Sequence, residues 1–213
     1  MIKAVVFDIN GVLLDSFEAN LKFFQDLMTK TGYRPPNREE FRELFHFSMW
    51  DAIEKLSRTN ENAEIQRIFE MGESRDVEYP LELLAMPEKA PEVIRNLSND
   101  YLLGIVTSRI RKSVYEAPKL AELEKYFSVA VSYEDTDNHK PHPEPLFLAA
   151  KKLGVRPEEC VYIGDVENDV KAARGAGMKC ILYSKQESGE PDHVTSKFSE
   201  IPRLIKLYSV SPE

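Results

Sequence analysis

Three short, nearly continuous apolar runs constrain the fold of this chain most strongly, because each leads to a polar residue. The runs and the polar residues that follow them are 2–7 with Asp8, 102–106 with Thr107, and 160–164 ending at Asp165. Short continuous apolar runs are typical of strands that are buried on both faces of a parallel sheet.

The sequence also contains two weaker strand-like segments and four helical patterns. The strands are expected at residues 129–131 and 179–182, and the helices at 90–99, 112–125, 144–153 and 169–176. Strands that alternate with helices imply right-handed parallel crossovers, and thus an α/β fold with a Rossmann-like parallel sheet flanked by helices. Ligands bind outside the carboxyl ends of such strands, where Asp8, Thr107 and Asp165 fall.

No strand-like run interrupts residues 16–85. Ser16 can cap a first helix, Gly32 can close it, and further helices are expected at 38–45, 49–57 and 63–75. We therefore expect an α/β core domain of residues 1–15 and 86–213, with an inserted all-helical cap domain of residues 16–85. Four aromatic residues of the insert are expected in the cap core, with the alternative that one or two of them face the substrate: Phe41, Phe45, Phe47 and Trp50.

The composition excludes several classes of partner. The chain has 213 residues and a net charge of -8, which disfavours binding to nucleic acid or to anionic lipid. No apolar run approaches the roughly 18 residues needed to span a membrane. Cys160 and Cys180 lie in apolar segments, so buried thiols are favoured over a disulfide. We expect a cytoplasmic monomer or weak homodimer whose residues 209–213 fray.

Acidic residues gather at the expected ligand-binding edge. Asp165 and Asp169 are four residues apart at the start of a helix, and Asp8 follows another strand. Asp8 alone would more simply be a turn or capping residue, and Asp169 alone could favour a helix N-terminus. Three carboxylates together need a cation, and Mg²⁺ prefers carboxylate oxygens while keeping waters for phosphate. The sequence therefore predicts a Mg²⁺ site and an anionic substrate.

A phosphate group would also need protein donors. Lys140 precedes Pro141, which biases it toward an extended loop, and the alternative is a solvated surface lysine. Thr107 and Ser108 can donate hydroxyl and backbone hydrogen bonds to a phosphoryl oxygen, or can simply end a strand. His139 and His142 flank Lys140, but solvated loop histidines are favoured over a metal site there.

Taken in order, these motifs resemble those of the haloacid dehalogenase-like hydrolase superfamily, specifically its phosphatase branch with a helical C1-type cap, similar to phosphoglycolate phosphatases. Residues 8–16 look like its first motif, Thr107 its second, and Lys140 with Pro141 its third. Residues 164–169 look like its fourth. The resemblance covers nearly the whole chain.

The resemblance implies a role for each residue. Asp8 would be the nucleophile that forms an aspartyl-phosphate, with Thr107 and Lys140 also catalytic. Thr107, Ser108 and Lys140 would bind the phosphoryl group. The Mg²⁺ ligands would come from four residues: Asp8, Asp165, Asp169 and the backbone carbonyl of Asn10.

Asn10 departs from the resemblance, because the family's phosphatases carry an aspartate two residues after the nucleophile. That aspartate protonates the leaving oxygen and then activates water, and the Asn10 amide can do neither. A positioned acid or base contributes about 10² to 10⁴ in rate. Relatives that act on carbon–halogen or phosphonate bonds also lack this aspartate, but the intact fourth motif disfavours the dehalogenases.

Two functional hypotheses follow. The first is a Mg²⁺-dependent phosphohydrolase that acts on a small phosphorylated metabolite, with turnover impaired by Asn10. The alternative is a phosphometabolite-binding or regulatory protein whose catalytic site is silent. Arg42, Arg109 and Arg111 are candidates to meet a substrate anion, and cap hinges are expected near residues 15–16 and 85–87.

Overall fold

A computed structural model describes residues 1–45 and 47–208 of the chain, so residues 209–213, where fraying is expected, lie outside its described part. The chain divides into two compact units. The first unit comprises Met1–Asp15 and Met86–Glu213, and the second is Ser16–Ala85. The division coincides with the boundaries expected for a core and an insert.

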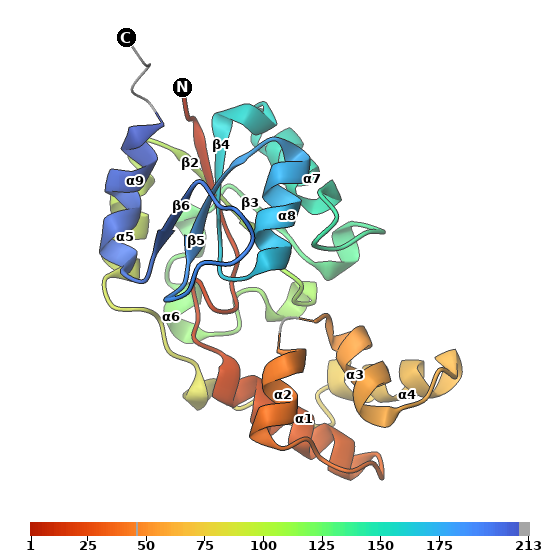
Figure 1. Cartoon of the computed structure of the whole chain (residues 1–213). Helices are drawn as coiled ribbons and strands as arrows, with labels where there is room; N and C mark the ends of the chain where they lie inside the picture. The colour runs from red at the N-terminus through yellow and green to blue at the C-terminus, as the bar shows by residue number, and fades with distance from the viewer. Residues whose placement is uncertain (46, 209–213) are drawn as a thin grey trace. The chain divides into compact units, whose positions relative to one another are not determined.

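The first unit is built on a six-stranded parallel sheet (Figure 1). Its strands are β1 (Ala4–Phe7), β2 (Leu102–Val106), β3 (Val129–Val131), β4 (Cys160–Gly164), β5 (Lys179–Tyr183) and β6 (His193–Thr195). The order is β3-β2-β1-β4-β5-β6, which places β1 between β2 and β4. This order confirms the expected Rossmann-like α/β fold.

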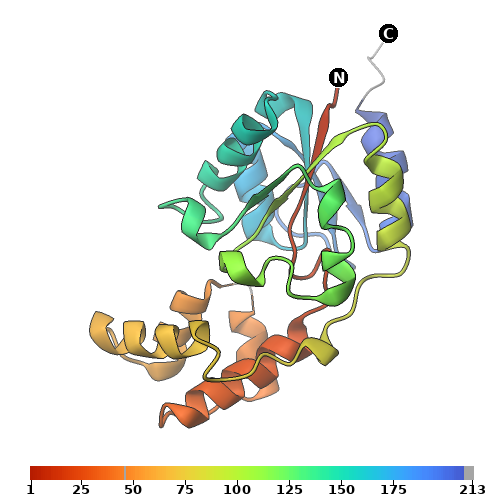
Figure 2. The ribbon, with the colours of Figure 1, turned by 180° about the vertical axis from the view of Figure 1, so that it is seen from behind.

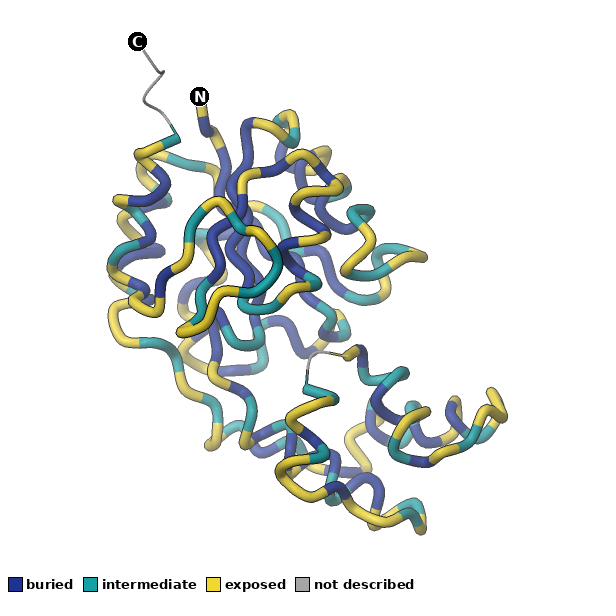
Figure 3. The backbone as a smooth tube through the Cα atoms, viewed as in Figure 1, coloured by how far each residue is buried: buried dark blue, intermediate teal, exposed yellow. Residues whose placement is uncertain are grey.

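Helices cover both faces of the sheet (Figures 1 and 2). Helices α5 (Ala90–Leu97) and α9 (Ile201–Leu207) lie together on one face, and α7 (Glu144–Leu153) and α8 (Glu167–Ala176) lie together on the other. Every residue of β1 and β4 is buried, as the dark central strands of Figure 3 show. Burial on both faces explains why these strands are continuous apolar runs rather than alternating ones.

The structure corrects one expected helix. Residues 112–125 do not form a continuous helix but contain a 3₁₀ turn, η2 (Arg111–Ser113), the short helix α6 (Pro118–Ala121) and a second turn, η3 (Glu124–Tyr126). Pro118 is the physical reason, because proline lacks an N–H and is tolerated only in the first turn of a helix. Strand β6 and helix α9 were not anticipated, since their apolar patterns are short.

The second unit is helical throughout its regular elements. Its helices are α1 (Phe17–Lys30), α2 (Arg38–Leu44), α3 (Met49–Ser57) and α4 (Asn62–Glu73), followed by the 3₁₀ turn η1 (Leu81–Leu83). Phe41 is 1% exposed and belongs to the hydrophobic cluster of this unit, against which Phe45 and Trp50 pack. Ser16 is the N-cap residue of α1, as expected, but its side chain makes no capping hydrogen bond. Phe47 is exposed and lies outside this cluster.

Cys160 and Cys180 are both buried and free, as the sequence indicates. Among the described residues, no helix is long and apolar enough to cross a membrane.

Candidate active site

The candidate site lies at the carboxyl edge of the three central strands. Phe7 is in register with Ile105 of β2 on one side and Ile163 of β4 on the other. Asp8 therefore follows the strand between those that deliver Thr107 and Asp165. The strand order reverses at β1 and β4, the place where ligands bind in open α/β sheets.

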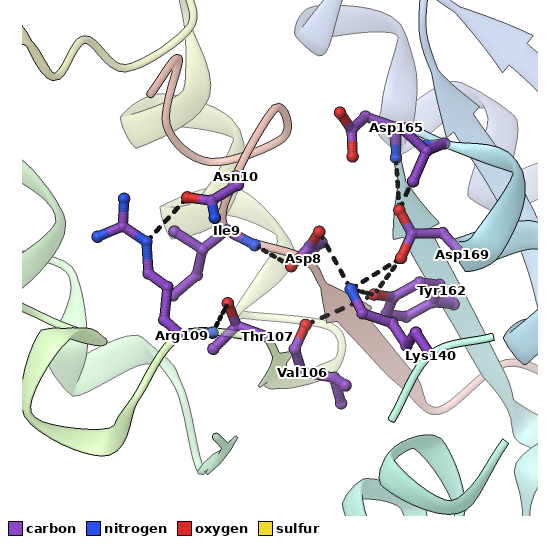
Figure 4. Close-up of polar contacts among 11 residues, drawn as sticks. Asp8, Ile9, Asn10, Val106, Thr107, Arg109, Lys140, Tyr162, Asp165 and Asp169 are labelled. Carbon is purple, nitrogen blue, oxygen red and sulfur yellow. Dashed lines mark hydrogen bonds and ion pairs between the residues drawn. The ribbon is translucent and has the colours of Figure 1, made fainter. Parts of the chain in front are cut away.

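Three carboxylates and one ammonium group meet at this edge (Figure 4). One oxygen from each of Asp8, Asp165 and Asp169 lies within 4.8 Å of the others. Lys140 Nζ is 3.1 Å from Asp8 Oδ2 and 2.8 Å from Asp169 Oδ1, and its side chain is only 7% exposed. The acids at three sequence positions thus form one cluster with Lys140 as the internal cation.

Burial and mutual repulsion govern the ionisation of this cluster. Burial raises the pKa of Asp8 to about 6, although Lys140 opposes this rise. Burial, followed by the charges of Asp169 and Asp8, raises the pKa of Asp165 well above its usual range. Burial disfavours the charged form of Lys140, but Asp169 and Asp8 outweigh it, so its pKa is raised. The cluster carries more negative charge than Lys140 alone neutralises, which favours binding of a further cation.

Asp169 holds the cluster together. Burial opposes its ionisation, but the Lys140 charge and backbone hydrogen bonds outweigh this effect and lower its pKa. The amides of Asp165 and Val166 donate to Asp169 Oδ2 at 3.0 and 3.3 Å. This contact at the start of α8 explains why an acid four residues after Asp165 has a structural as well as an electrostatic role.

Two glycines make room for the carboxylates. Gly11 has φ +77°, and a Cβ there would lie 1.9 Å from Asp165 Oδ2. A Cβ on Gly164 would lie 2.2 Å from the Cβ of Asp169. Neither distance is compatible with a side chain, so both acids depend on a neighbouring glycine for their positions.

The remaining candidates lie around Asp8. The Ile9 amide donates to Asp8 Oδ1 at 2.7 Å, which leaves Oδ2 facing Lys140. Thr107 is 4% exposed and its Oγ1 accepts from the Arg109 amide at 3.2 Å, while Ser108 is half-buried. Asn10 follows Asp8 and its Oδ1 accepts a 2.8 Å hydrogen bond from Arg109 Nε.

The donor set fits magnesium. Hard carboxylate oxygens are the ligands that Mg²⁺ prefers, and it commonly takes one or two of them together with waters and phosphate oxygens. Among the described residues, the three aspartates are the only group of three or more acids, histidines or cysteines close enough to hold a metal ion. His139 instead stacks on Tyr133, with ring centroids 3.9 Å apart, and His142 is exposed.

Sequence reasoning missed two contributors. Tyr162 is fully buried in β4, and its hydroxyl accepts from Lys140 Nζ at 3.0 Å while donating to Asp169 at 3.1 Å. Glu116 pairs with Arg109 at 3.1 Å. Tyr162 lies three residues before Asp165 in β4. This spacing alone does not predict that Tyr162 reaches the site, because the contact depends on the twist of the strand and its register with its neighbours.

The three arginines considered as anion receptors differ in their surroundings. Arg109 is 8% exposed and bonded to Glu116 and Asn10. Arg111 is exposed and pairs with Asp135 at 2.9 Å. Arg42 is exposed on α2 of the second unit.

The chain is similar to several known proteins over nearly its whole length. A pyrophosphatase PpaX from Bacillus pumilus is 30% identical over 217 residues, covering 96% of each chain. A solved HAD-superfamily hydrolase of subfamily IA from Geobacter sulfurreducens is 29% identical, with a TM-score of 0.72 and 96% coverage of each chain. A CbbY mutant from Rhodobacter sphaeroides, solved with xylulose-(1,5)bisphosphate, is 25% identical, with a TM-score of 0.81 and coverage of 94% and 96%.

The model of one family, the haloacid dehalogenase-like hydrolases, matches residues 5–183, from within β1 to the end of β5. That span contains all the carboxylates of the cluster, Lys140, Thr107 and the whole helical unit. The chain belongs to the haloacid dehalogenase-like hydrolase family.

Proposed function

We propose that this protein is a Mg²⁺-dependent phosphatase of small phosphorylated metabolites in which Asp8 is the nucleophile and Asn10 limits turnover. The observation that carries the proposal is the cluster in which Asp8 Oδ2 lies 3.1 Å from the buried Lys140 ammonium, beside Asp165 and Asp169. The pyrophosphatase name of the PpaX relatives and the bisphosphate bound to the CbbY mutant support a phosphorylated substrate.

In the proposed reaction, an Asp8 carboxylate oxygen attacks phosphorus and forms an O–P bond while the bond to the leaving oxygen breaks. Water then attacks the same phosphorus, the Asp8 O–P bond breaks, and inorganic phosphate is released. Mg²⁺, held by Asp8, Asp165, Asp169 and the Asn10 carbonyl, would supply positive charge against the phosphoryl oxygens. Lys140 and the hydroxyl groups of Thr107 and Ser108 would orient the phosphoryl group.

Two proton transfers accompany these steps: the leaving oxygen gains a proton and the attacking water loses one. The Asn10 amide supplies neither, because it is not an acid or a base near neutral pH. We expect turnover to be about 10²- to 10⁴-fold slower than in an enzyme with a carboxyl group at position 10. This corresponds to a barrier higher by roughly 3 to 5 kcal/mol. The loss should be smaller for pyrophosphate, because departing phosphate needs a proton less than an alkoxide does.

The test is phosphate release from a panel of alkyl phosphates, sugar phosphates and pyrophosphate with Mg²⁺, for the chain as it stands and for Asn10→Asp. We expect the chain as it stands to release phosphate slowly. In Asn10→Asp the rate of release from alkyl phosphates should rise about 10²- to 10⁴-fold. Asp8→Asn in the Asn10→Asp background is the matched control and should abolish release. The proposal fails if Asn10→Asp releases phosphate from no member of the panel.

A second candidate is a phosphometabolite-binding protein without turnover, favoured by the amide at position 10 and its hydrogen bond from Arg109. Intact-mass measurement after mixing with substrate and Mg²⁺ separates the two. A phosphoryl group on Asp8 supports the enzyme. Calorimetric Mg²⁺-dependent binding with no mass gain supports the binding protein.

A further inference from the structure

Arg109 is a buried arginine whose guanidinium group faces the loop that carries Asp8. It lies two residues after Thr107, in the loop that follows β2, and is 8% exposed. Its Nε donates to Asn10 Oδ1 at 2.8 Å, and its Nη1 donates to Ser113 O at 3.3 Å and to Glu116 Oε1 at 3.1 Å. Figure 4 shows the Asn10 side chain turned toward this guanidinium group. Arg109 therefore links the loop after β1 to the loop after β2.

Glu116 fixes the direction in which Arg109 donates. The side chains of Arg109 and Glu116 are 7% and 9% exposed, so each needs the other as a counter-charge. A guanidinium group is planar, and its N–H groups point in fixed directions. With Nη1 held by Glu116 and Ser113, the Nε–H bond can point only at the oxygen of residue 10.

This geometry determines which way the Asn10 amide faces. An N–H donor needs an acceptor, and of the two amide atoms only Oδ1 can accept. Arg109 thus holds Oδ1 and turns Nδ2 to the other side. An aspartate at this position would give one carboxylate oxygen to Arg109 and place its second oxygen where Nδ2 lies.

We propose that Arg109, fixed by Glu116, is a positioning residue that sets the orientation of the side chain at position 10. The catalytic part of this inference rests on the proposed phosphatase function, in which position 10 carries the proton-transfer group. In this proposal Arg109 acts through residue 10. It holds one polar atom of residue 10 and thereby fixes the direction of the other.

The structural part is tested by nitrogen-15 NMR of the Arg109 Nε–H signal, which is assigned by its loss in Arg109→Met. In Asn10→Ala the acceptor is gone, so exchange of this proton with water should accelerate at least about tenfold. In Asn10→Asp the protection should remain. Unchanged exchange in Asn10→Ala would overturn the proposal, and this readout does not depend on enzyme activity.

The catalytic part is tested in the Asn10→Asp background. Because Arg109→Met alone would leave Glu116 buried without its partner, the variant is Arg109→Met with Glu116→Met. We expect kcat to fall about 10- to 10²-fold with KM within about twofold, since the loss is one of orientation. Arg109→Lys should recover part of kcat, because lysine donates but lacks the planar fork.

Arg174→Met is the matched control, because Arg174 is an exposed arginine on α8 that pairs with Glu190. Its kcat should stay within about twofold. An unchanged kcat in the Arg109→Met/Glu116→Met variant would overturn the catalytic part. If Asn10→Asp itself releases no phosphate, the proposed function fails, and the Arg109 Nε–H exchange still decides whether Arg109 orients residue 10.

Discussion

The hydroxyl group of Tyr162 shows how one buried polar atom can organise the charges around it. Burial, followed by the charge of Asp169, raises the pKa of this phenol well above its usual range, so it keeps its proton. It donates that proton to Asp169 Oδ1 and accepts from Lys140 Nζ. The hydroxyl group thus bridges Lys140 and Asp169 through two hydrogen bonds.

Removing this hydroxyl should weaken the site without abolishing the fold. Tyr162→Phe is expected to lower the free energy of unfolding by about 1 to 2 kcal/mol, because Lys140 and Asp169 each lose one hydrogen bond. In the Asn10→Asp background kcat should fall severalfold. Urea unfolding and steady-state kinetics measure both. Tyr183→Phe removes a half-buried hydroxyl from β5 and is the control; equal kinetic losses in the two variants would contradict the bridging role.

The close approach of Gly11 to Asp165 leads to a second prediction. Gly11→Ala puts a methyl group 1.9 Å from Asp165 Oδ2, so the carboxylate must move away from the cluster. Mg²⁺ affinity measured by calorimetry should fall at least about tenfold. Gly154→Ala is a matched control, because Gly154 also has positive φ, +70°, but nothing lies within 4 Å of the added Cβ. If both variants bind Mg²⁺ equally well, the clash is not what governs the site.

Among the elements, the pairing of β1 with β4 matters most, because these strands deliver Asp8 and Asp165 to the same edge. The pairing begins at Lys3, whose amide donates to Glu159 O at 2.8 Å and whose ammonium is 2.8 Å from Glu159 Oε1. The Glu159 carboxylate also accepts from the Arg156 amide at 3.0 Å. One side chain therefore joins the start of β1 to the turn that precedes β4.

This junction makes stability depend on pH. The hydrogen bond from Lys3, followed by those from Arg156, lowers the pKa of Glu159 to about 2. A lowered folded-state pKa means that the stabilisation is complete above the unfolded value of roughly 4.3 and is lost as pH falls through about 2. Glu159→Gln should therefore be less stable than the parent at pH 7, and the difference should shrink below pH 4.

Urea unfolding of both proteins at pH 7, 4 and 2.5 measures this difference. Glu158→Gln is the control, because Glu158 is an exposed neighbour whose ion pair with Arg156 should contribute little. A stability difference for Glu159→Gln that is constant across this pH range would refute the assignment.

At the scale of the whole molecule, each compact unit has its own hydrophobic cluster. Cluster residues of the first unit come from its strands and from α7 and α8. Those of the second unit come from its four helices and from Val77, and Phe41 is one of them. All the carboxylates of the candidate site, with Lys140, belong to the first unit.

A destabilising substitution in the core of one unit should therefore leave the stability of the other unit unchanged. Phe41 packs against Phe24, with ring centroids 5.2 Å apart, and Phe41→Ala should cost the second unit about 3 to 5 kcal/mol. Hydrogen exchange followed by mass spectrometry should then show faster exchange in residues 16–85, while Mg²⁺ binding in the first unit persists.

Phe198→Ala is the matched control for the first unit. Phe198 is 2% exposed and stacks on Phe7, the residue before Asp8, with ring centroids 6.2 Å apart. Faster exchange should then appear in the first unit instead. Uniform acceleration over the whole chain in both variants would show that the two units unfold as one.

The fold class and the order of the chemical groups along the chain can be predicted from the sequence, because buried parallel strands need continuous apolar runs and their carboxyl ends share one edge. Local signals in the sequence also single out five candidate site residues: Asp8, Thr107, Lys140, Asp165 and Asp169. The break of residues 112–125 was also readable in principle, since Pro118 stands inside the expected helix.

Which side chains meet depends on the tertiary structure. Tyr162 reaches Lys140 across 22 residues of sequence, and Arg109 reaches Asn10 across 99. Such contacts depend on strand register and on how each loop returns to the sheet, which no local pattern encodes. The identity of Asn10 is therefore plain in the sequence, but the guanidinium group that orients its amide appears only when β1 and β2 lie side by side.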